Sequence, residues 1–392
     1  MGITCRAAAK RRNEGVPDMA CVRRVLIVGG GPSGMSLAIC LRRENIDVDL
    51  IERDPHWQPV GAGLSLNAQS LKAFQRVGVL DQLQAAGHCH HGLELYDLSG
   101  RLLNRVVPPA DPSGIPSGGG ILRPVLHRIL ADETRGRGAR VRLGVSVESL
   151  REESSGVLVR FTDGGEQHYD LVVGADGLHS QVRGLIFPEA AKPRFTGQGC
   201  WRAVLPRPSG VDGVRMYMDS EHKAGLNPVS HDEMYMFLLE HVPDNRRMPE
   251  EQWPALLAER LAPFGGIWHE LRANLGSHSR INYRPLEMLL LPAPWYRGRA
   301  LVIGDAAHAT TPHMAYGCGL AVEDAVVLAE ELSGASPDLE PALRRFMERR
   351  FERCKAVVEG SVRLGELEMA HASLEEHGKV SASVGRLISQ PI

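Results

Sequence analysis

The chain has 392 residues, of which 43% are hydrophobic and 23% are charged, and its formal net charge is −2. This composition is typical of a globular protein long enough for two closely joined domains, and the balanced charge argues against nucleic acid as a partner. No apolar run approaches the ~20 residues of a membrane-spanning helix, so we expect no integral membrane association. Seven scattered cysteines without a CxxC pair favour reduced thiols, a cytoplasmic location and no metal site.

The first folded element follows a basic segment, residues 1–22, that lacks the apolar stretch of a secretory signal and is expected to be a disordered leader. An apolar strand at 25–28 leads through glycines into a helix that ends near Arg43, and a second strand covers 48–53. This β-α-β order predicts the start of a parallel sheet.

The glycines between that strand and helix form the pattern G-x-G-x-x-G, and an acidic residue ends the next strand. In this context the pattern predicts a dinucleotide site, because glycines let the backbone approach a pyrophosphate and the helix N-terminus offers N–H groups. The acidic residue accepts hydrogen bonds from a ribose. The candidate contacts at this end of the cofactor are Gly29, Gly31, Ser33, Gly34, Glu52 and Arg53.

The rest of the chain predicts an α/β fold with a Rossmann-like domain, an inserted sheet and C-terminal helices. We expect helices at 67–86, 121–135 and 339–358, a flexible loop at 111–120, and strands at 157–164 and 169–177. Strand-like segments separated by turns between about 195 and 280 indicate an inserted, mostly antiparallel sheet. The predicted division is an FAD-binding domain at 23–190 and 285–360, a substrate domain at 191–284 and a tail at 361–392.

Two further carboxylates follow buried strands: Asp176 in "VVGADG" and Asp305 in "LVIGDA". Ligands of open α/β sheets lie across the carboxyl ends of the strands. Carboxylates there favour a long ligand rich in hydroxyl groups, so FAD fits better than NAD. The chain has one dinucleotide fingerprint, so NADH or NADPH is expected to visit transiently as electron donor.

The loop after Asp305 leads into a helix that we expect to begin near Gly317, with its N–H groups directed at the negative charge of a reduced flavin. Gly317 allows close approach of the backbone, and Pro312 stiffens the loop. Glu323 and Asp324 are expected to cap and solvate this helix, and His308 to pack behind the Gly-Asp turn.

These motifs in this order, with "RPVLHRIL", "GADGLHSQVR" and "GDAAHATTP", resemble the single-component FAD-dependent aromatic hydroxylases, the group of p-hydroxybenzoate, salicylate and 6-hydroxynicotinate hydroxylases. The resemblance covers roughly residues 23 to 360. It implies that NAD(P)H reduces the flavin, that O2 adds at C4a, and that the hydroperoxide hydroxylates an aromatic or N-heteroaromatic ring. It also implies flavin contacts by Arg123, Asp176 and Asp305, and a backbone contact to adenine by Val147, on the strand preceding the DG motif.

Substrate-side candidates follow from the same resemblance. Arg202, in "CWRAV", matches a Trp-Arg pair common in the family, and Tyr316 stands where a Gln is usual. His313 is the best candidate for a group that touches the substrate, because an imidazole titrates near neutral pH and can remove a phenolic proton. The catalytic candidates are therefore His313, Arg202 and Tyr316, and further residues that are expected to line the cavity are Tyr217, His231 and Tyr235.

Three functions remain open on this scaffold. The leading one is a monooxygenase with a small aromatic substrate, O2 and NAD(P)H as partners, with a homodimer as a possible assembly. A second is an FAD-dependent reductase or dehydrogenase without oxygen insertion, and a third is a flavin-binding protein without turnover. The fold by itself does not separate these functions.

Overall fold

A six-stranded sheet forms the first layer of the structure, a computed structural model that describes residues 22–59, 61–245, 248–276, 278–334 and 338–392. Its order is β18-β19-β12-β1-β2-β8, with parallel pairing everywhere except between β18 and β19. Its strands are β1 (Arg24–Val28), β2 (Asp47–Glu52), β8 (Arg140–Leu143), β12 (Leu171–Gly174), β18 (Tyr296–Arg297) and β19 (Ala300–Val302). The parallel sheet and the first β-α-β unit confirm the predicted fold class.

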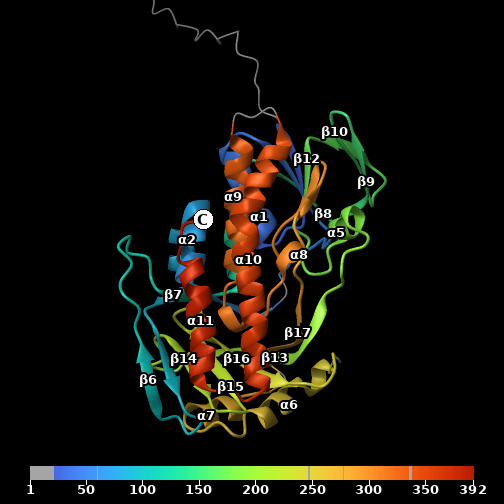
Figure 1. Cartoon of the computed structure of the whole chain (residues 1–392). Helices are drawn as coiled ribbons and strands as arrows, with labels where there is room; N and C mark the ends of the chain where they lie inside the picture. The colour runs from blue at the N-terminus through green and yellow to red at the C-terminus, as the bar shows by residue number, and fades with distance from the viewer. Residues whose placement is uncertain (1–21, 60, 246–247, 277, 335–337) are drawn as a thin grey trace, which may run out of the picture.

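Helices cover this sheet, which is why its central strands β1, β12 and β19 are nearly continuous apolar runs rather than alternating ones. The helix α1 (Pro32–Arg43) packs against α9 (Gly317–Ser333) and α4 (Arg123–Gly136). Nine consecutive residues of α1, from Ser33 to Leu41, are buried. The start of α9 at Gly317 confirms the predicted helix boundary, and places its first turn at the same end of the sheet as the glycine-rich turn (Figure 1).

A seven-stranded sheet forms the second layer, in the order β17-β13-β16-β15-β14-β5-β6. Its strands are β5 (Leu93–Tyr96), β6 (Leu102–Val106), β13 (Arg194–Pro206), β14 (Val214–Met218), β15 (Lys223–Pro228), β16 (Glu233–His241) and β17 (Arg280–Met288). All neighbours pair antiparallel except β14 and β5. The mostly antiparallel sheet was predicted, but β5 and β6, which precede residue 191, also belong to it. Pairing over this distance leaves no local signal in the sequence.

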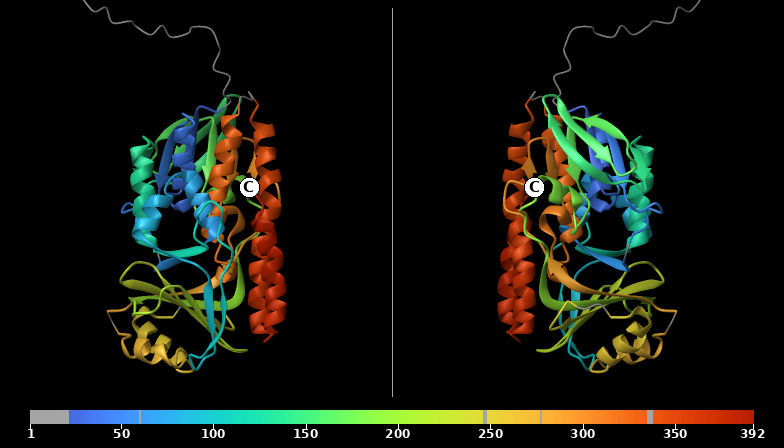
Figure 2. Two further views of the ribbon diagram at one scale, coloured as in Figure 1. Left: turned by 90° about the vertical axis from the view of Figure 1, so that its left-hand side faces the viewer. Right: turned by 90° about the vertical axis from the view of Figure 1, so that its right-hand side faces the viewer.

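One face of the second sheet is covered by α6 (Trp253–Arg260) and α7 (Ile267–Ala273), which lie below it in Figures 1 and 2. Trp201, Leu226, Met236 and Leu238 of the sheet pack there around Trp268 of α7. Because side chains alternate between the two faces of a strand, the neighbours of these residues point to the opposite face, toward the first layer. We call that opposite face the cavity face.

Smaller elements connect the two layers. The predicted helix at 67–86 is two helices, α2 (Ala68–Val77) and α3 (Leu80–Ala86), separated by Gly78 with a positive φ of 91°. The predicted loop at 111–120 gives way at Gly118 to β7 (Gly118–Leu122), which pairs with β3 (Gly63–Asn67) and β4 (His88–His90).

A third sheet contains β9 (Val147–Glu153), β10 (Gly156–Phe161) and β11 (Glu166–Tyr169). The sequence analysis placed Val147 on the strand that directly precedes the DG motif. In the structure it lies on β9 instead. Two antiparallel strands, β10 and β11, intervene between β9 and β12, which leads into that motif.

The predicted tail at 361–392 is helical instead. The helix α10 (Leu339–Met369) continues well beyond the predicted end at 358, and α11 (Leu374–Ile388) folds back along it. Leu364, Leu367, Val384 and Ile388 are buried, so both segments have apolar contacts that hold them on the domain. Figures 1 and 2 show these two helices along one side of the molecule, beside both layers.

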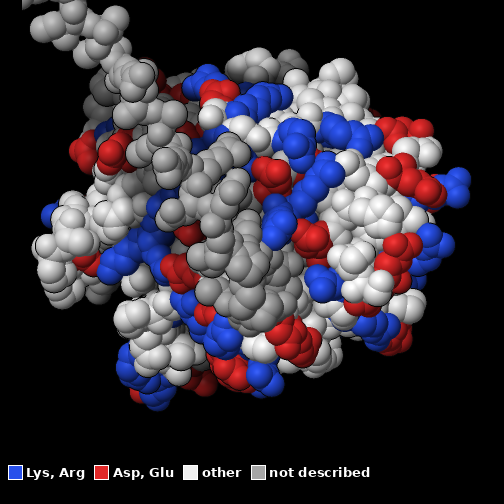
Figure 3. Space-filling model, turned by 90° about the horizontal axis from the view of Figure 1, so that it is seen from above, with Lys and Arg blue, Asp and Glu red and all other residues white. Residues whose placement is uncertain are grey.

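On the face that Figure 3 presents, Lys and Arg are interspersed with Asp and Glu. Within the described residues, no helix combines the length and apolar character needed to cross a bilayer. The predicted leader lies outside the described residues except for Val22, which is buried.

Candidate active site

A cavity of about 690 Å³ lies between the carboxyl ends of the parallel strands and the cavity face of the second sheet. The first layer contributes the glycine-rich turn, Ala175 and Gly177 after β12, and Asp305 after β19. The loop 310–316 and the first turn of α9 close one side, and Arg202 and Tyr235 lie on the second sheet. The three strand ends therefore open into one space, although Asp176 itself is not among the residues that line it.

The glycine-rich turn has the geometry of a phosphate site. Gly29 has a positive φ of 111°, and a Cβ at Gly34 would lie 2.0 Å from the carbonyl oxygen of Gly29, so protein packing alone requires both glycines. A Cβ at Gly31 would meet no described atom within 4 Å. Gly31 is the N-cap of α1 and has no side-chain cap, which leaves the first N–H groups of that helix open to an anion.

Glu52 is fixed beside this turn, at the end of β2. One carboxylate oxygen accepts a hydrogen bond from the Gly30 N–H at 2.8 Å and the other accepts one from the Asp54 N–H at 2.9 Å. Ser33 is buried and lines the cavity, whereas Arg53 is exposed and does not line it. Val147 is fully buried at the start of β9 and also lies outside the cavity wall.

The two aspartates at strand ends, Asp176 and Asp305, differ in their hydrogen-bond partners. Asp176 accepts hydrogen bonds from the Ser180 hydroxyl at 2.5 Å and from the N–H groups of Gln181 and Val182, so it caps the short helix α5 (Gln181–Ile186). Asp305 begins α8 (Asp305–His308), and its side chain is open to the cavity with no hydrogen-bond partner among the described residues. Enclosure by the protein raises the pKa of Asp305, so a ligand hydroxyl that donates to this carboxylate would stabilise it.

Arg123 and Arg202 approach the cavity from opposite layers. Burial lowers the pKa of Arg123, and the like charge of Arg202 lowers it further. Arg123 forms no side-chain hydrogen bond or ion pair among the described residues, and the Nη groups of Arg202 also lack such a partner. Two cations without a directly bonded carboxylate favour an anionic or electron-rich ligand between them.

The first turn of α9 points its N–H groups at this space, because Gly317 and Cys318 line the cavity and the N-cap, Tyr316, supplies no side-chain cap. Gly317 was predicted to permit close approach of a flavin, and its environment is compatible with that role. The neighbouring Gly319 serves packing instead, since a Cβ there would lie 2.3 Å from Ser70 Oγ and 2.5 Å from the Tyr316 ring.

His313 belongs to the cavity wall, and its predicted contact with the substrate stays a prediction. Its side chain is fully buried; Nδ1 lies 2.9 Å from Thr311 Oγ1 and Nε2 lies 3.1 Å from a carboxylate oxygen of Glu368 on α10. Burial lowers the pKa of His313, although Glu368 opposes this. The contacts fit a residue that fixes the loop around Pro312, which starts the short helix η2 (Pro312–Met314), against α10.

The hydroxyl of Tyr316, the third catalytic candidate, is bound by other side chains of the protein. The residue is 1% exposed, and its hydroxyl donates to Glu323 and accepts from Arg353 at 3.3 Å. Burial and the neighbouring Glu323 raise the pKa of Tyr316, so the phenol stays protonated. A role in positioning the first turn of α9 fits this arrangement better than a chemical one.

Glu323 and Asp324 are buried rather than solvated, which corrects the prediction for this pair. Arg350 of α10 donates to Asp324 at 2.8 Å and to Glu323 at 2.7 Å, and Arg353 donates to Glu323 at 2.8 Å. All four residues are at most 7% exposed. We call these four residues the α9–α10 ion network.

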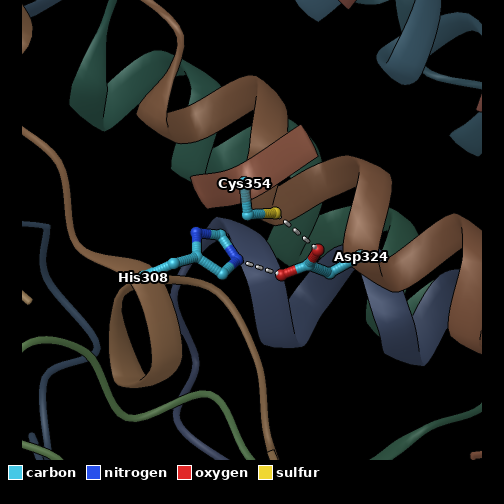
Figure 4. Close-up of side chains that lie close together, drawn as sticks. All are labelled: His308, Asp324 and Cys354. Carbon is cyan, nitrogen blue, oxygen red and sulfur yellow. Dashed lines mark hydrogen bonds and ion pairs between the residues drawn. The ribbon is translucent and has the colours of Figure 1, made fainter. Parts of the chain in front are cut away.

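The network reaches the Gly-Asp turn through Asp324. Its carboxylate accepts hydrogen bonds from the Gly304 N–H at 2.9 Å and from His308 Nε2 at 2.5 Å (Figure 4). His308 therefore lies behind the turn, as predicted. Ligand atoms of His308, Asp324 and Cys354 lie within 4.8 Å of one another. Because Arg350 also contacts Asp324 and Cys354, a cation already occupies this corner, and the geometry fits an ion network better than a metal site.

Sequence reasoning missed two polar residues of the cavity wall. His90, on β4, has neither ring nitrogen hydrogen-bonded among the described residues, and burial lowers its pKa to about 4. Asn227, on β15, leaves its side-chain oxygen without a partner there. Of the three proposed lining residues, Tyr235 lines the cavity, Tyr217 packs on the opposite face and His231 is exposed. Tyr235 and Tyr217 lie on different strands, β16 and β14, so their faces follow from strand pairing rather than from alternation along one strand.

We predict that Gly31→Val abolishes FAD binding but preserves the fold. The added side chain occupies space that no described protein atom uses, and the backbone at Gly31 is extended, so the unfolding free energy should change by about 1 kcal/mol or less. The measurement is flavin absorbance per chain with urea unfolding of the apoprotein. Gly34→Val is the matched contrast and should unfold the domain. A Gly31→Val protein with one FAD per chain would contradict the assignment.

The α9–α10 ion network predicts a specific acid sensitivity. Burial alone would raise the pKa of Asp324, but His308 and Arg350 lower it to about 2 from 3.8. A lowered folded-state pKa contributes stability that is present above about pH 4 and is lost as the pH falls toward 2; its size is on the order of 2 kcal/mol.

Asp324→Asn should therefore be less stable at pH 7 and should lose less further stability between pH 4 and pH 2 than the wild type. Urea unfolding across this range measures the difference, with Asp132→Asn, an exposed carboxylate on α4, as control. Parallel pH profiles for wild type and Asp324→Asn would count against a charged Asp324 in the network.

Comparison with known proteins agrees with this geometry. Residues 23–361 match the model of a family described as FAD binding domain. Aurachin C monooxygenase/isomerase of Stigmatella aurantiaca is 35% identical over 359 residues, which cover 88% of this chain and 89% of that protein. The 2-heptyl-3-hydroxy-4(1H)-quinolone synthase of Pseudomonas aeruginosa is 34% identical over 314 residues, which cover 78% and 79%.

The fold is shared with solved flavoproteins. The structure of Klebsiella pneumoniae HpxO complexed with FAD and uric acid has a TM-score of 0.81 at 24% identity, covering 94% of this chain and 93% of that one. The unpartnered Asp305 carboxylate, the open space at Gly31 and the uncapped helix N-termini fit FAD, with NAD(P)H as the family's usual electron donor. The chain belongs to the FAD-dependent aromatic hydroxylases, and is a flavoprotein monooxygenase.

Proposed function

We propose that this protein hydroxylates the heteroaromatic ring of a quinolone-type substrate, with NADH or NADPH as electron donor and O2 as the source of the inserted oxygen. A relative named as a 4(1H)-quinolone synthase is 34% identical over 78% of the chain, which supports a fused N-heteroaromatic ring. Bound FAD supplies the redox chemistry that joins the electron donor to O2. The residues of the chain bind the ring, orient it and exclude water.

The observation that carries the proposal is the pair Arg202 and Tyr235 on the cavity face. The Arg202 Nε donates to the Tyr235 hydroxyl at 3.1 Å, and its Nη groups remain available to a ligand. Burial raises the pKa of Tyr235, so the hydroxyl keeps its proton and can donate a hydrogen bond. Together these groups match a ring carbonyl or hydroxyl oxygen that becomes more negative as the ring is activated.

The surroundings of the pair favour an uncharged ring over a small carboxylate. Phe237 and Leu239 follow Tyr235 on the same face of β16, and Met216 of β14 lines the same cavity. An apolar wall of this kind accommodates a fused aromatic ring and keeps water away from the reacting atoms.

The test is aerobic NADH and NADPH oxidation by FAD-loaded protein with 4-hydroxyquinolines and with monocyclic phenols. We expect quinolones to stimulate oxidation and to gain one oxygen atom from isotopically labelled O2. Arg202→Met should lower kcat/KM for the quinolone by about tenfold or more without loss of FAD, because a hydrogen bond to a charged group contributes about 1.5–3 kcal/mol.

Arg284→Met is the matched control, because Arg284 is an exposed arginine on β17 of the same sheet. It should leave kcat/KM unchanged. Oxidation of NAD(P)H that no aromatic compound stimulates, or substrate that never gains labelled oxygen, would refute the proposed function.

A further inference from the structure

An apolar strip continues from the Arg202–Tyr235 pair toward the edge of the second sheet. Its members line the cavity and come from four strands that are neighbours or next neighbours in the sheet. The strip consists of Phe237 and Leu239 on β16, Val214 and Met216 on β14, Leu93 on β5 and Val106 on β6.

Strand pairing shows that the strip is continuous across the sheet. Val214 is in register with Leu93, and Leu93 is in register with Val106. Between β14 and β16, a Cβ at Gly225 would lie 2.5 Å from the Phe237 ring and 3.1 Å from Met216 Sδ. The glycine therefore lets the Phe237 ring lie across β15 to the vicinity of Met216.

The strip does not fill the core of the second sheet. That core lies on the opposite face, where Tyr96, Tyr217 and Leu238 pack with α7. Residues of the strip alternate with these core residues along each strand, so their side chains are turned to the cavity. Leu239 also packs with Cys200 and Leu286, and Phe237 packs against them. The other strip residues belong to none of the described core clusters and line an open cavity, which points to an apolar ligand.

Apart from Lys223, the polar side chains of the second sheet named above lie at one end of the cavity face. Arg202, Tyr235 and Asn227 lie at the β13, β16 and β15 end, and the strip follows toward β6. The strip ends at the β5–β6 hairpin, where large apolar side chains of both strands, and of Val107 just after β6, remain unusually open. The exposed fractions are 37% for Leu93, 45% for Leu102, 46% for Leu103, 46% for Val106 and 61% for Val107.

An exposed apolar edge is uncommon on a protein surface, where edge strands are normally protected by charge. Here the charged residues of the hairpin, Glu94 and Arg105, are paired with each other, and Arg101 is paired with Asp97. The apolar residues are left as the continuation of the cavity wall to the surface.

We propose that this strip binds an alkyl chain attached to the heteroaromatic ring of the substrate. The inference rests on the proposed function, since the ring oxygen is bound by Arg202 and Tyr235. The chain then lies over Phe237 and Met216 and passes over Val214 and Leu93 toward the β5–β6 edge. The distance from β16 to β5 is three strand spacings, roughly 14 Å, which suits a fused ring with a chain of several carbons. The heptyl group in the name of the Pseudomonas relative's product has this chemistry.

The experiment titrates FAD-loaded protein with 2-methyl-, 2-pentyl-, 2-heptyl- and 2-nonyl-4(1H)-quinolone and follows the change in flavin absorbance. Full burial of one CH2 corresponds to about fourfold in affinity. Because the strip is partly open, we expect the dissociation constant to fall by about twofold for each added carbon between methyl and heptyl.

Two exposed leucines provide a matched pair of variants. Leu93, in the strip, is 37% exposed, and Leu185, on α5 and outside the cavity, is 38% exposed. Leu93→Lys should weaken heptyl quinolone binding by about tenfold or more and leave methyl quinolone binding within twofold of wild type. Leu185→Lys should change neither value.

The outcomes separate this inference from the proposed function. If methyl and heptyl quinolones bind equally and both are hydroxylated, the alkyl site is wrong and the proposed function stands. Equal effects of Leu93→Lys and Leu185→Lys also overturn the alkyl site. If no quinolone of any chain length perturbs the flavin or stimulates NAD(P)H oxidation, both proposals fail.

Discussion

The constraint on which the structure depends is the burial of two carboxylates on α9 against two guanidinium groups on α10. Charges of this kind are costly to remove from water unless each is paired. Here Arg350 donates to Asp324 and Glu323, and Arg353 donates to Glu323, so each of the four charges has an oppositely charged partner. Removing one partner of a buried ion pair lowers the free energy of unfolding by about 3–5 kcal/mol. The network therefore fixes the register of α9 on α10, and through Gly304 and His308 it fixes the turn that carries Asp305.

This arrangement positions the first turn of α9 and the Asp305 carboxylate before FAD binds. The seventh and eighth residues of α9, Glu323 and Asp324, are anchored in the network, so the first turn, from Gly317, is directed at the cavity. Asp305 follows an anchored glycine and keeps its own carboxylate free of protein partners among the described residues. Preorganised dipoles and charges of this kind need no rearrangement when a charged ligand binds. The second sheet adds Arg202, Tyr235 and the apolar strip to the same space.

The sequence predicted the elements whose signals are local. The glycine pattern between β1 and α1, the strand-end aspartates and the start of α9 at Gly317 all follow from spacing and apolar periodicity. It did not predict the burial of Glu323 and Asp324, because their partners lie in another helix. Arg350 and Arg353 do fall at helical spacing with buried Phe346 and Val357, and charged residues on an apolar stripe are a signal of buried pairing.

Other features have no local signal. The parallel pairing of β5 with β14 joins distant segments, and the orientation of the His313 ring depends on Glu368, which lies on α10. The position of a titratable side chain in a loop identifies a candidate, but its contacts decide its role. Arg202 shows the converse, since alternation along β13 places it on the face opposite the buried Trp201, whereas the face of Tyr235 follows only from the pairing of β13 with β16.

The central claim is that the carboxylate of Asp305 is left unpaired by the protein because it binds FAD. The most direct measurement is FAD titration of the apoprotein of wild type, Asp305→Ala and the surface control Asp132→Ala, with flavin fluorescence as the readout. The account predicts that Asp305→Ala raises the dissociation constant at least about tenfold, as expected for a hydrogen bond to a charged group, while Asp132→Ala leaves it unchanged. An Asp305→Ala protein that binds one FAD per chain with the affinity of the wild type would contradict it.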